Sequence, residues 1–347
     1  MNTAKTNPKS NSLGAGISER DVAGAISKSG YPLQTILANS LRQTFQIQEE
    51  WSYIDRDTRE LRTLDILAEK RLFEFDNASQ PRIRPTLDIL IECKQSNLPY
   101  IFFLTPEAPW LPEFPALAGL FKNSLTLTTD DDASTYHYSI LHALGLARHD
   151  FLSKTDYCMT FSKCVRKGSD LELSGTDAYQ NLVLPLLKAL LHFQNAEAPP
   201  TTAYYFDCHL ALAVAVLDAP MIGVDTSKGQ TDLVLMPWVR VARHESYENR
   251  DWTERFKTYA IDIVHKDYFE SYLKKHLLPY ASRFSDLALK HQQELATGEA
   301  FAYSMSKGRW DTIEDRLQPR RLRAKATRWK LILSNIISLL HRGGKRK

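Results

Sequence analysis

Asp65, Glu92 and Lys94 are the residues of this chain whose types and spacing best fit a catalytic site. Residues 87–94 form an apolar run, LDILIECK, without Gly or Pro, and this predicts a buried strand. Side chains of a strand alternate between its two faces, so we expect Glu92 and Lys94 to share one face. Asp65 belongs to an earlier predicted strand over 61–69. Charged groups in such strands are costly to bury unless they pair or take part in chemistry.

Two carboxylates and an amine in one place suit the hydrolysis of a phosphodiester bond. That reaction needs a nucleophilic water, stabilisation of the extra negative charge, and a stabilised leaving oxygen. Mg²⁺, or Mn²⁺ in its place, serves several of these needs and prefers oxygen ligands. We expect Asp65 and Glu92 to supply carboxylates and the Cys93 carbonyl to supply a further oxygen. Lys94 would then assist the attacking water or stabilise the phosphate charge.

The elements that would position these residues precede and surround them. Ser18 and Asp21 predict the cap of a short helix, and a second helix over 32–45 has Pro32 in its first turn. A loop is predicted over 76–86, where Asn, Asp, Ser and Pro gather. Four strands are predicted, over residues 46–54, 61–69, 87–94 and 100–105.

These residues and elements resemble the PD-(D/E)xK nucleases. The match covers about residues 30–105 and rests on the helix that begins GYPLQ, the strand-turn-strand from Tyr53 to Asp65, and the segment LIECK that ends at Lys94. The resemblance implies an α/β fold, with a restriction-endonuclease-like mixed sheet flanked by helices and extended by a second α/β half. It also implies that Asp65 and Glu92 bind the metal, that Lys94 is the catalytic lysine, and that nucleic acid, usually DNA, is hydrolysed with Mg²⁺.

This chain departs from the family's pattern at one position. Many members of the family carry a Glu on the first helix that faces the site, and the matching residue here is Gln34. Gln34 is either an ordinary solvent-facing helix residue or a member of the site, with an amide oxygen but no charge.

The second half of the chain predicts more helices and strands. We expect one large domain in which this half extends or covers the first sheet, with a boundary near residue 110 as the alternative. The predicted division is a disordered N-terminus over 1–17, a nuclease-like core over 18–110, an α/β extension over 111–300 and a basic amphipathic tail over 301–347. The predicted elements of the second half are helices over 177–195, 266–276 and 278–297, and strands over 203–217, 232–242 and 257–264.

Composition excludes few classes of function, because the net charge of the 347 residues is only +3. The four cysteines form no Cys-x-x-Cys pair, so a zinc site is not expected. Without a secretory signal or a membrane-length apolar run, we expect a reduced, cytoplasmic protein without a transmembrane segment. From Arg316 onward there is no Asp or Glu, so the tail is a solvated segment, a clamp on nucleic-acid phosphates or a contact to anionic membrane.

Several other polar residues receive structural interpretations. Asp88 is expected near a solvated strand start, and Asp55 and Asp57 in a turn. His209 alternates with apolar residues and is expected to be a hydrogen-bonded core histidine. Cys93 is expected to be a small buried residue without nucleophilic function.

Three functions remain open from the sequence. The first is a Mg²⁺-dependent nuclease acting on DNA. The second is a catalytically weak or inactive relative that binds nucleic acid or a protein partner, which Gln34 favours, with Glu92 and Lys94 forming an ion pair at a strand end. The third is a membrane-surface protein held by its basic tail. The sequence also leaves a homodimer open.

Overall fold

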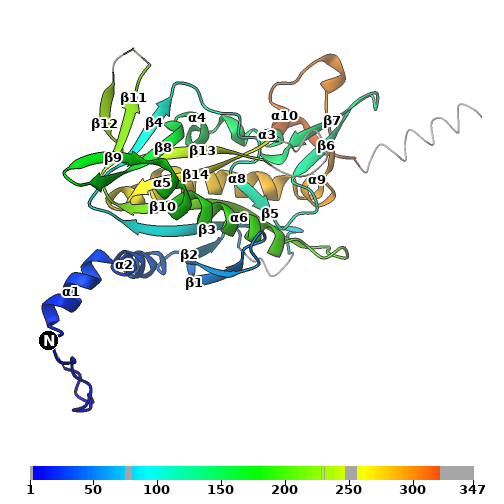
Figure 1. Cartoon of the computed structure of the whole chain (residues 1–347). Coiled ribbons are helices and arrows are strands. Elements are labelled where there is room, and N and C mark those ends of the chain that lie inside the picture. Colours follow the sequence, from blue (N-terminus) through cyan, green and yellow to red (C-terminus); the bar gives the residue numbers. More distant parts are fainter. Residues whose placement is uncertain (1–2, 75–79, 228, 230, 247–255, 321–347) are drawn as a thin grey trace, which may run out of the picture.

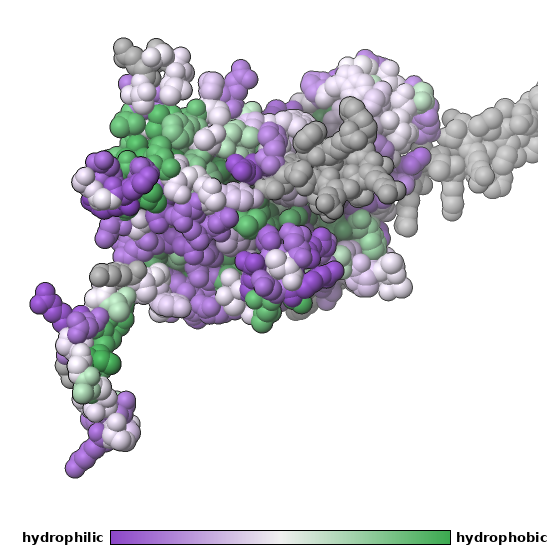
Figure 2. All heavy atoms as spheres, viewed as in Figure 1, coloured by the Kyte–Doolittle hydropathy of each residue, from purple (hydrophilic) through white to green (hydrophobic). Residues whose placement is uncertain are grey.

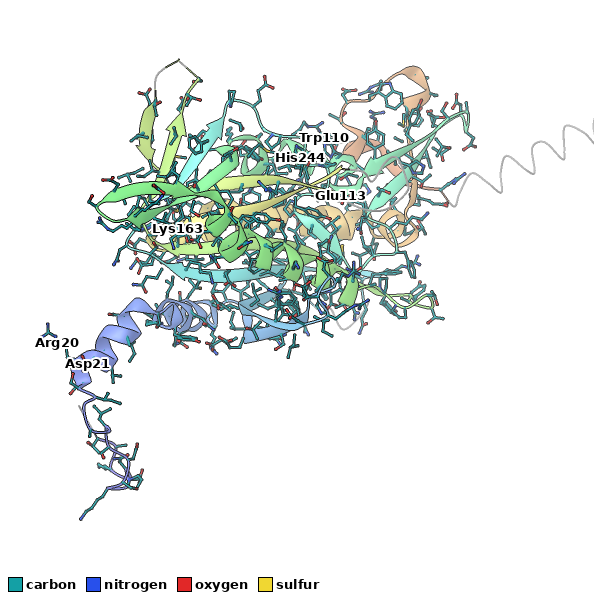
Figure 3. The ribbon with its side chains drawn as sticks, viewed as in Figure 1. Arg20, Asp21, Trp110, Glu113, Lys163 and His244 are labelled. Carbon is teal, nitrogen blue, oxygen red and sulfur yellow. The ribbon has the colours of Figure 1, made fainter. Side chains whose placement is uncertain are left out.

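The computed structural model describes residues 3–74, 80–227, 229, 231–246 and 256–320. Helix α1 (Glu19–Lys28) begins with the expected cap, because Ser18 and Asp21 exchange hydrogen bonds in a capping box. Figure 1 shows α1 extending away from the body of the chain, and Figure 3 shows Arg20 and Asp21 there, remote from the sheet. Helix α2 (Tyr31–Leu41) follows, with its proline in the first turn.

The first three strands form an antiparallel meander beside α2. They are β1 (Gln46–Ile54), β2 (Leu61–Arg71) and β3 (Ile83–Gln95). Strand β10 (Phe206–Asp218) then lies parallel to β3 and pairs with it along its whole length. Nearly every residue of β3 and β10 is buried, as expected for central strands covered on both faces.

The same sheet continues with strands from the second half of the chain. Strands from the stretches 18–110 and 111–300 therefore share one twelve-stranded mixed sheet (Figure 1). Beyond β10 the order is β14 (Phe256–His265), β13 (Trp238–Ser246), β8 (Tyr157–Lys167), β4 (Tyr100–Thr105), β11 (Met221–Asp225) and β12 (Asp232–Leu235), with β5 (Ala116–Ala118) on β10 and β9 (Asp170–Ser174) on β8.

Helices cover both faces of this sheet, which confirms the expected α/β architecture. On one face α2 packs against β3 and β10 together with α7 (Phe269–Tyr272), the π-helical turn η5 (Leu273–Leu277) and α8 (Leu278–Lys290). On the other face lie α5 (Gly175–Ala178), the π-helical turn η2 (Tyr179–Val183) and α6 (Leu184–Ala196). Each face buries its own apolar core.

A second, four-stranded sheet lies to one side. Residues 301–320 take part in it, while the rest of the predicted tail, 321–347, lies outside the described residues. Its strands are β16 (Leu317–Pro319), β15 (Glu299–Ala302), β6 (Ser124–Thr129) and β7 (Thr135–Ser139). Short helices connect the parts: α3 (Ile140–Ala143), the 3₁₀ turn η1 (Leu146–Arg148), α4 (Asp150–Ser153), the 3₁₀ turns η4 (Lys266–Tyr268) and η6 (Met305–Lys307), α9 (Gln292–Thr297) and α10 (Ile313–Arg316).

Two of the expectations that were wrong involve a proline. β3 begins at Ile83, inside the predicted loop over 76–86, although the strand contains Pro85. The Pro85 carbonyl still accepts a hydrogen bond from the Leu72 amide. Proline has no backbone N–H, so no donor is left unpaired at this position. The predicted strand over 232–242 is in fact two strands, because the chain breaks at Pro237 between β12 and β13.

Arg240 anchors the second half of the sheet. Its guanidinium has no exposed surface and binds both carboxylate oxygens of Asp262, at 2.6 and 2.9 Å. Tyr272 donates a hydrogen bond to the same carboxylate at 2.6 Å, and the Phe151 carbonyl accepts one from Arg240 at 3.0 Å. This fully paired network joins β13 and β14 to α4 and α7 without leaving a buried charge unpaired.

The far edge of the large sheet carries exposed apolar side chains. Leu233 and Leu235 of β12 are 66% and 76% exposed, and Figure 2 shows hydrophobic atoms gathered over this part of the molecule. Within the described chain, no helix combines the length and apolar character needed to cross a membrane.

Candidate active site

Asp65 and Glu92 lie where β2 and β3 stop pairing with each other. The last pair of this ladder is Ile66 with Ile91, so Asp65 and Glu92 take the next opposite positions. Just beyond, the Cys93 amide donates to the Oδ2 atom of Asp65 at 2.6 Å. This bond satisfies an amide that has left the ladder, and it fixes the Asp65 carboxylate at the point where the strands diverge.

Lys94 lies on the same face of β3 as Glu92. Its Nζ atom forms an ion pair with the Oε1 atom of Glu92. Glu92 is only 6% exposed, whereas a third of the Lys94 side chain reaches solvent. The structure therefore brings Asp65, Glu92 and Lys94 together, in an arrangement that a purely structural ion pair would also make.

Burial and neighbouring charge shift the pKa of each ionisable group in this cluster. Burial raises the pKa of Glu92 to about 7, the neighbouring charge of Asp65 adds to the shift, and Lys94 opposes it. Burial also raises the pKa of Asp65. The hydrogen bond from Cys93 and the charge of Lys94 lower this pKa, but they do not cancel the effect of burial. For Lys94, burial disfavours the charged amine, but the carboxylates outweigh it and raise the pKa. The two neighbouring carboxylates thus repel each other, and the single ammonium beside them pairs with Glu92.

Gln34 belongs to this cluster and does not face solvent. Its side chain is 6% exposed, and its amide nitrogen donates to the Oε1 atom of Glu50 at 2.7 Å and to the Asp65 carbonyl at 3.2 Å. Helix α2 can place Gln34 here because it begins close to the end of β3. A Cβ atom at Gly30 would lie 3.4 Å from the Cys93 carbonyl oxygen, an ordinary van der Waals distance, so the start of α2 lies against the end of β3.

The thiol and the backbone carbonyl of Cys93 have different surroundings. Its thiol is 3% exposed and burial raises its pKa, as expected for a small buried residue and not for a nucleophile. Its carbonyl, the expected further metal ligand, lies against Gly30 at the start of α2.

The donor set suits a cation that prefers oxygen. Asp65 and Glu92 supply carboxylates on adjacent strands, and their mutual repulsion would be relieved by positive charge. In the described parts of the chain, no group of three or more His, Cys, Asp or Glu side chains is arranged to hold a metal ion. Two carboxylates are the number that a Mg²⁺ ion commonly takes from a protein alongside several waters.

Glu50 is the neighbour that the sequence analysis missed. It lies in β1 between the pairs Glu49–Ile66 and Trp51–Leu64, and therefore opposite Asp65. The register of the hairpin that turns at 55–60 places Glu50 opposite Asp65. The sequence analysis missed Glu50 because it did not assign this register.

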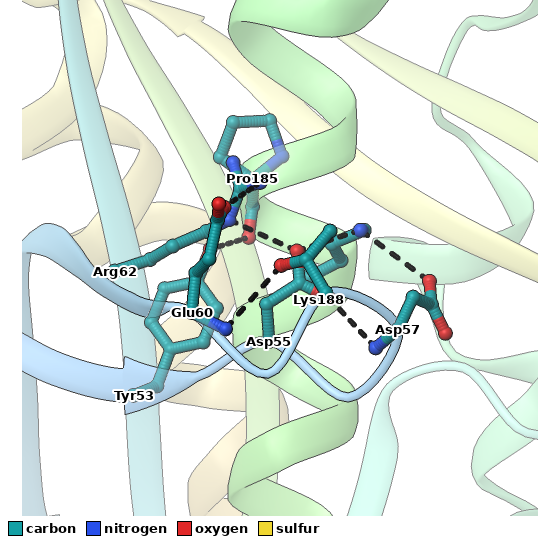
Figure 4. Close-up of polar contacts among 8 residues, drawn as sticks. Tyr53, Asp55, Asp57, Glu60, Arg62, Pro185 and Lys188 are labelled. Carbon is teal, nitrogen blue, oxygen red and sulfur yellow. Dashed lines mark hydrogen bonds and ion pairs between the residues drawn. The ribbon is translucent and has the colours of Figure 1, made fainter.

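Asp55 lies at the start of the expected turn over 55–58, and its side chain is buried there. Its carboxylate is 1% exposed and binds Lys188 of α6 at 2.7 Å and Arg62 of β2 at 2.9 Å (Figure 4). Burial disfavours the charged carboxylate, but the bonds from Lys188 and the Asp57 amide outweigh it and lower the pKa. Asp57 stays exposed, 3.3 Å from Lys188. These contacts fasten the β1–β2 hairpin to α6 and so support the site.

Asp88 was expected near solvent and is instead 1% exposed. The pairing of β3 with β10 buries it, and its Oδ2 atom lies 2.8 Å from the Nδ1 atom of His209. Thr86 bonds to both side chains, so His209 is the hydrogen-bonded core histidine that was expected. His209 borders a cavity of about 340 Å³ whose wall also includes Trp51, Glu69, Arg71, Arg84 and Glu197.

This pair predicts a pH-dependent contribution to stability. Burial lowers the pKa of His209, but the bond to Asp88 outweighs it and raises the pKa overall. The stabilisation is then complete below the unfolded pKa of about 6.5 and is lost as the pH rises through the folded pKa. We expect His209→Gln to cost roughly 1.5–3 kcal/mol of unfolding free energy at pH 5.5 and less at pH 9, measured by urea denaturation. An equal loss at both pH values would contradict a charged His209.

No family model, curated protein or solved structure matches this chain. The case for a function therefore rests on the residues and contacts described above.

Proposed function

We propose that this protein is a Mg²⁺-dependent nuclease that hydrolyses phosphodiester bonds of DNA. The observation that carries the proposal is the convergence of Asp65, Glu92 and Lys94 at the diverging ends of β2 and β3. Burial and mutual repulsion raise the pKa of Glu92 to about 7, which marks a site where a cation is favoured.

The order of elements around the site supports a restriction-endonuclease-like core. Helix α2, the hairpin β1–β2 and strand β3 follow one another as in the resemblance described from the sequence. Helix α6 then leads to β10, which lies parallel to β3 and extends the same sheet. Residues 96–174, including β4 to β9, form an insertion between β3 and the helices that lead to β10.

Each residue has a proposed role that follows from its contacts. Asp65 and Glu92 would hold Mg²⁺, which when bound supplies positive charge to stabilise the phosphate and to activate the attacking water. The Cys93 amide orients Asp65, and Gln34 holds the backbone of Asp65. The carboxylates keep Lys94 protonated, so its role is to donate hydrogen bonds to the attacking water or a phosphate oxygen.

A cleavage assay with the full chain tests the proposal. Supercoiled plasmid, linear duplex, single-stranded DNA and single-stranded RNA are incubated with Mg²⁺ or with EDTA. We expect Mg²⁺-dependent cleavage of DNA that Asp65→Asn and Glu92→Gln reduce by at least about 100-fold. Asp150→Asn is the matched control, because Asp150 is an exposed carboxylate paired with Lys154 on α4. Failure to cut any of the DNA substrates, or equal cleavage by Asp65→Asn, overturns the proposal.

The second candidate is a nuclease-like protein that binds nucleic acid or a protein partner without cutting. It is favoured by the uncharged Gln34 and by the direct pairing of Lys94 with Glu92. Nucleic-acid binding that persists in EDTA and in Lys94→Met, but disappears when residues 321–347 are removed, would support it. That deletion begins after β16 and leaves the small sheet complete.

A further inference from the structure

Strand β12 lies at one end of the large sheet, and β11 is its only strand neighbour in the part of the chain that the structure describes. The Met236 amide donates to the Met221 carbonyl at 2.9 Å, so these residues form a hydrogen-bonded pair in the register of the β11–β12 ladder. Bonded and non-bonded pairs alternate along an antiparallel ladder. Val234 therefore directs its backbone groups toward β11, whereas Leu233 and Leu235 direct theirs to the open edge.

The side chains at this open edge are apolar. Leu233 and Leu235 share one side of β12 and are 66% and 76% exposed, and Val234 on the other side is 49% exposed. A mostly apolar groove of about 400 Å³ lies beside Leu235, and its wall includes Met236 and Pro237. A further β-strand would cover such an edge well, because it satisfies the backbone groups and buries the apolar side chains at once.

The opposite edge of the sheet, β1, is protected against such pairing. Its exposed residues include Gln46, Gln48, Glu49 and Glu50, and the φ of Glu50 is +50°. Charged side chains and an irregular backbone are common means of keeping an edge strand from pairing with another chain. Strand β12 has the sequence DLVL, without Lys, Pro or a positive φ. The contrast indicates that β12 is an edge that another chain covers.

The partner that β12 fits is a second copy of itself. When two β12 strands pair antiparallel about a centre at Val234, Leu233 of each copy lies opposite Leu235 of the other. The backbone groups of both leucines point to the open edge, so each leucine pair can exchange two hydrogen bonds. Asp232, the one charged residue of β12, lies opposite Met236 of the second copy and not opposite another carboxylate. The strand is therefore complementary to itself in backbone register, apolar character and charge.

We propose that β12 is a dimerisation edge, at which two copies of this chain join their large sheets by antiparallel β12–β12 pairing about a two-fold axis. One short strand and its adjoining groove bury on the order of several hundred Å², which is below the roughly 1,000 Å² of a stable interface. We therefore expect a dimer that depends on concentration, with a dissociation constant on the order of 10–100 µM. Dimerisation and catalysis are separate, because β12 and the strands of the proposed active site lie toward opposite ends of the strand order.

Sedimentation of the full chain between about 1 and 300 µM tests the proposal. The wild-type chain should change from monomer to dimer across this range. Leu235→Lys sets an ammonium against a leucine of the second copy and should weaken association at least about tenfold. Leu61→Lys is the matched control, because Leu61 is a strand leucine that is 72% exposed on β2. A mixture of Leu235→Lys with Leu233→Glu should associate again, since the two introduced charges lie opposite each other only in a mixed dimer of this register.

Val234→Cys tests the register itself. Position 234 of one copy faces position 234 of the other in a non-bonded pair, where Cα atoms lie about 4.5 Å apart, within the range for a disulfide. The four native cysteines are buried. We therefore expect Val234→Cys to form a covalent dimer under mild oxidation and Leu61→Cys to stay monomeric. A wild-type chain that is monomeric at about 300 µM would overturn the proposal. So would wild-type association in Leu235→Lys, or a Val234→Cys chain that cross-links no faster than Leu61→Cys.

Discussion

Replacement of Lys94 by methionine should lower Mg²⁺-dependent cleavage by roughly 10²–10⁴-fold, the range expected for the loss of a positioned hydrogen-bond donor at the reacting groups. Methionine keeps much of the length and the apolar stem of lysine but carries no charge. Divalent-cation binding should stay equal or become tighter, because the ammonium that pairs with Glu92 also repels a cation. Single-turnover cleavage and Mn²⁺ binding, measured on the same preparation, separate these two effects.

The matched control for Lys94 is Lys154→Met. Lys154 lies on the surface after α4, is 71% exposed and forms an ion pair at 2.8 Å with Asp150. This variant should cleave DNA like the wild-type chain. A Lys94→Met protein that remains folded by circular dichroism and cuts at the wild-type rate would remove Lys94 from the site.

Divalent-cation binding should rise steeply with pH and level off above pH 7. Burial and the charge of Asp65 raise the pKa of Glu92 to about 7, and only the ionised carboxylate binds a cation. Below that pKa each pH unit costs about tenfold in apparent affinity, so we expect a roughly 50-fold gain between pH 5 and pH 7. The raised pKa of Asp65 acts in the same direction. Isothermal titration with Mn²⁺ across this range measures the profile.

Glu69 supplies the control for the pH profile. Burial and the charge of Asp88 raise its pKa too, but it lies on the cavity beside His209. Glu69→Gln should therefore keep the wild-type pH profile of cation binding. A profile that is flat between pH 5 and pH 7 in the wild-type chain would show that Glu92 is not a ligand.

The local part of the fold could be predicted from the sequence. The capping residues of α1, the proline of α2 and the alternation in β1 and β2 are short-range signals, and each marked its element. The period of two in β3 was sufficient to place Glu92 and Lys94 on one face. To place Asp65 beside Glu92, it was enough to predict that β2 and β3 are neighbouring strands of the same meander.

Long-range pairing could not be predicted in the same way. Asp88 and His209 are 121 positions apart and meet only because β3 and β10 are parallel neighbours. Asp55 meets Lys188 because α6 crosses the end of the β1–β2 hairpin. Neither contact leaves a periodic trace in the sequence, so Asp88 was assigned to solvent and the burial of Asp55 in its turn was not predicted.

Strands β5, β6 and β7 were not predicted, for a different reason. β5 is three residues long, β6 is a six-residue run of Ser, Thr and two Leu, and β7 consists of Thr, Tyr, His and Ser. Runs this short or this polar carry a weak strand signal and become strands through their partners, such as β10 for β5 and β6 for β7. The contact between Glu50 and Gln34 was missed because it depends on hairpin register and on a backbone angle that residue type does not encode.

The most direct test of the central claim is an anomalous difference map from a crystal of the full chain grown with a short DNA duplex and Mn²⁺. The account predicts a peak between the carboxylates of Asp65 and Glu92, about 2.1 Å from their oxygens, with the Lys94 amine turned toward a phosphate. A complex in which Mn²⁺ and the phosphate lie away from these three side chains would contradict it.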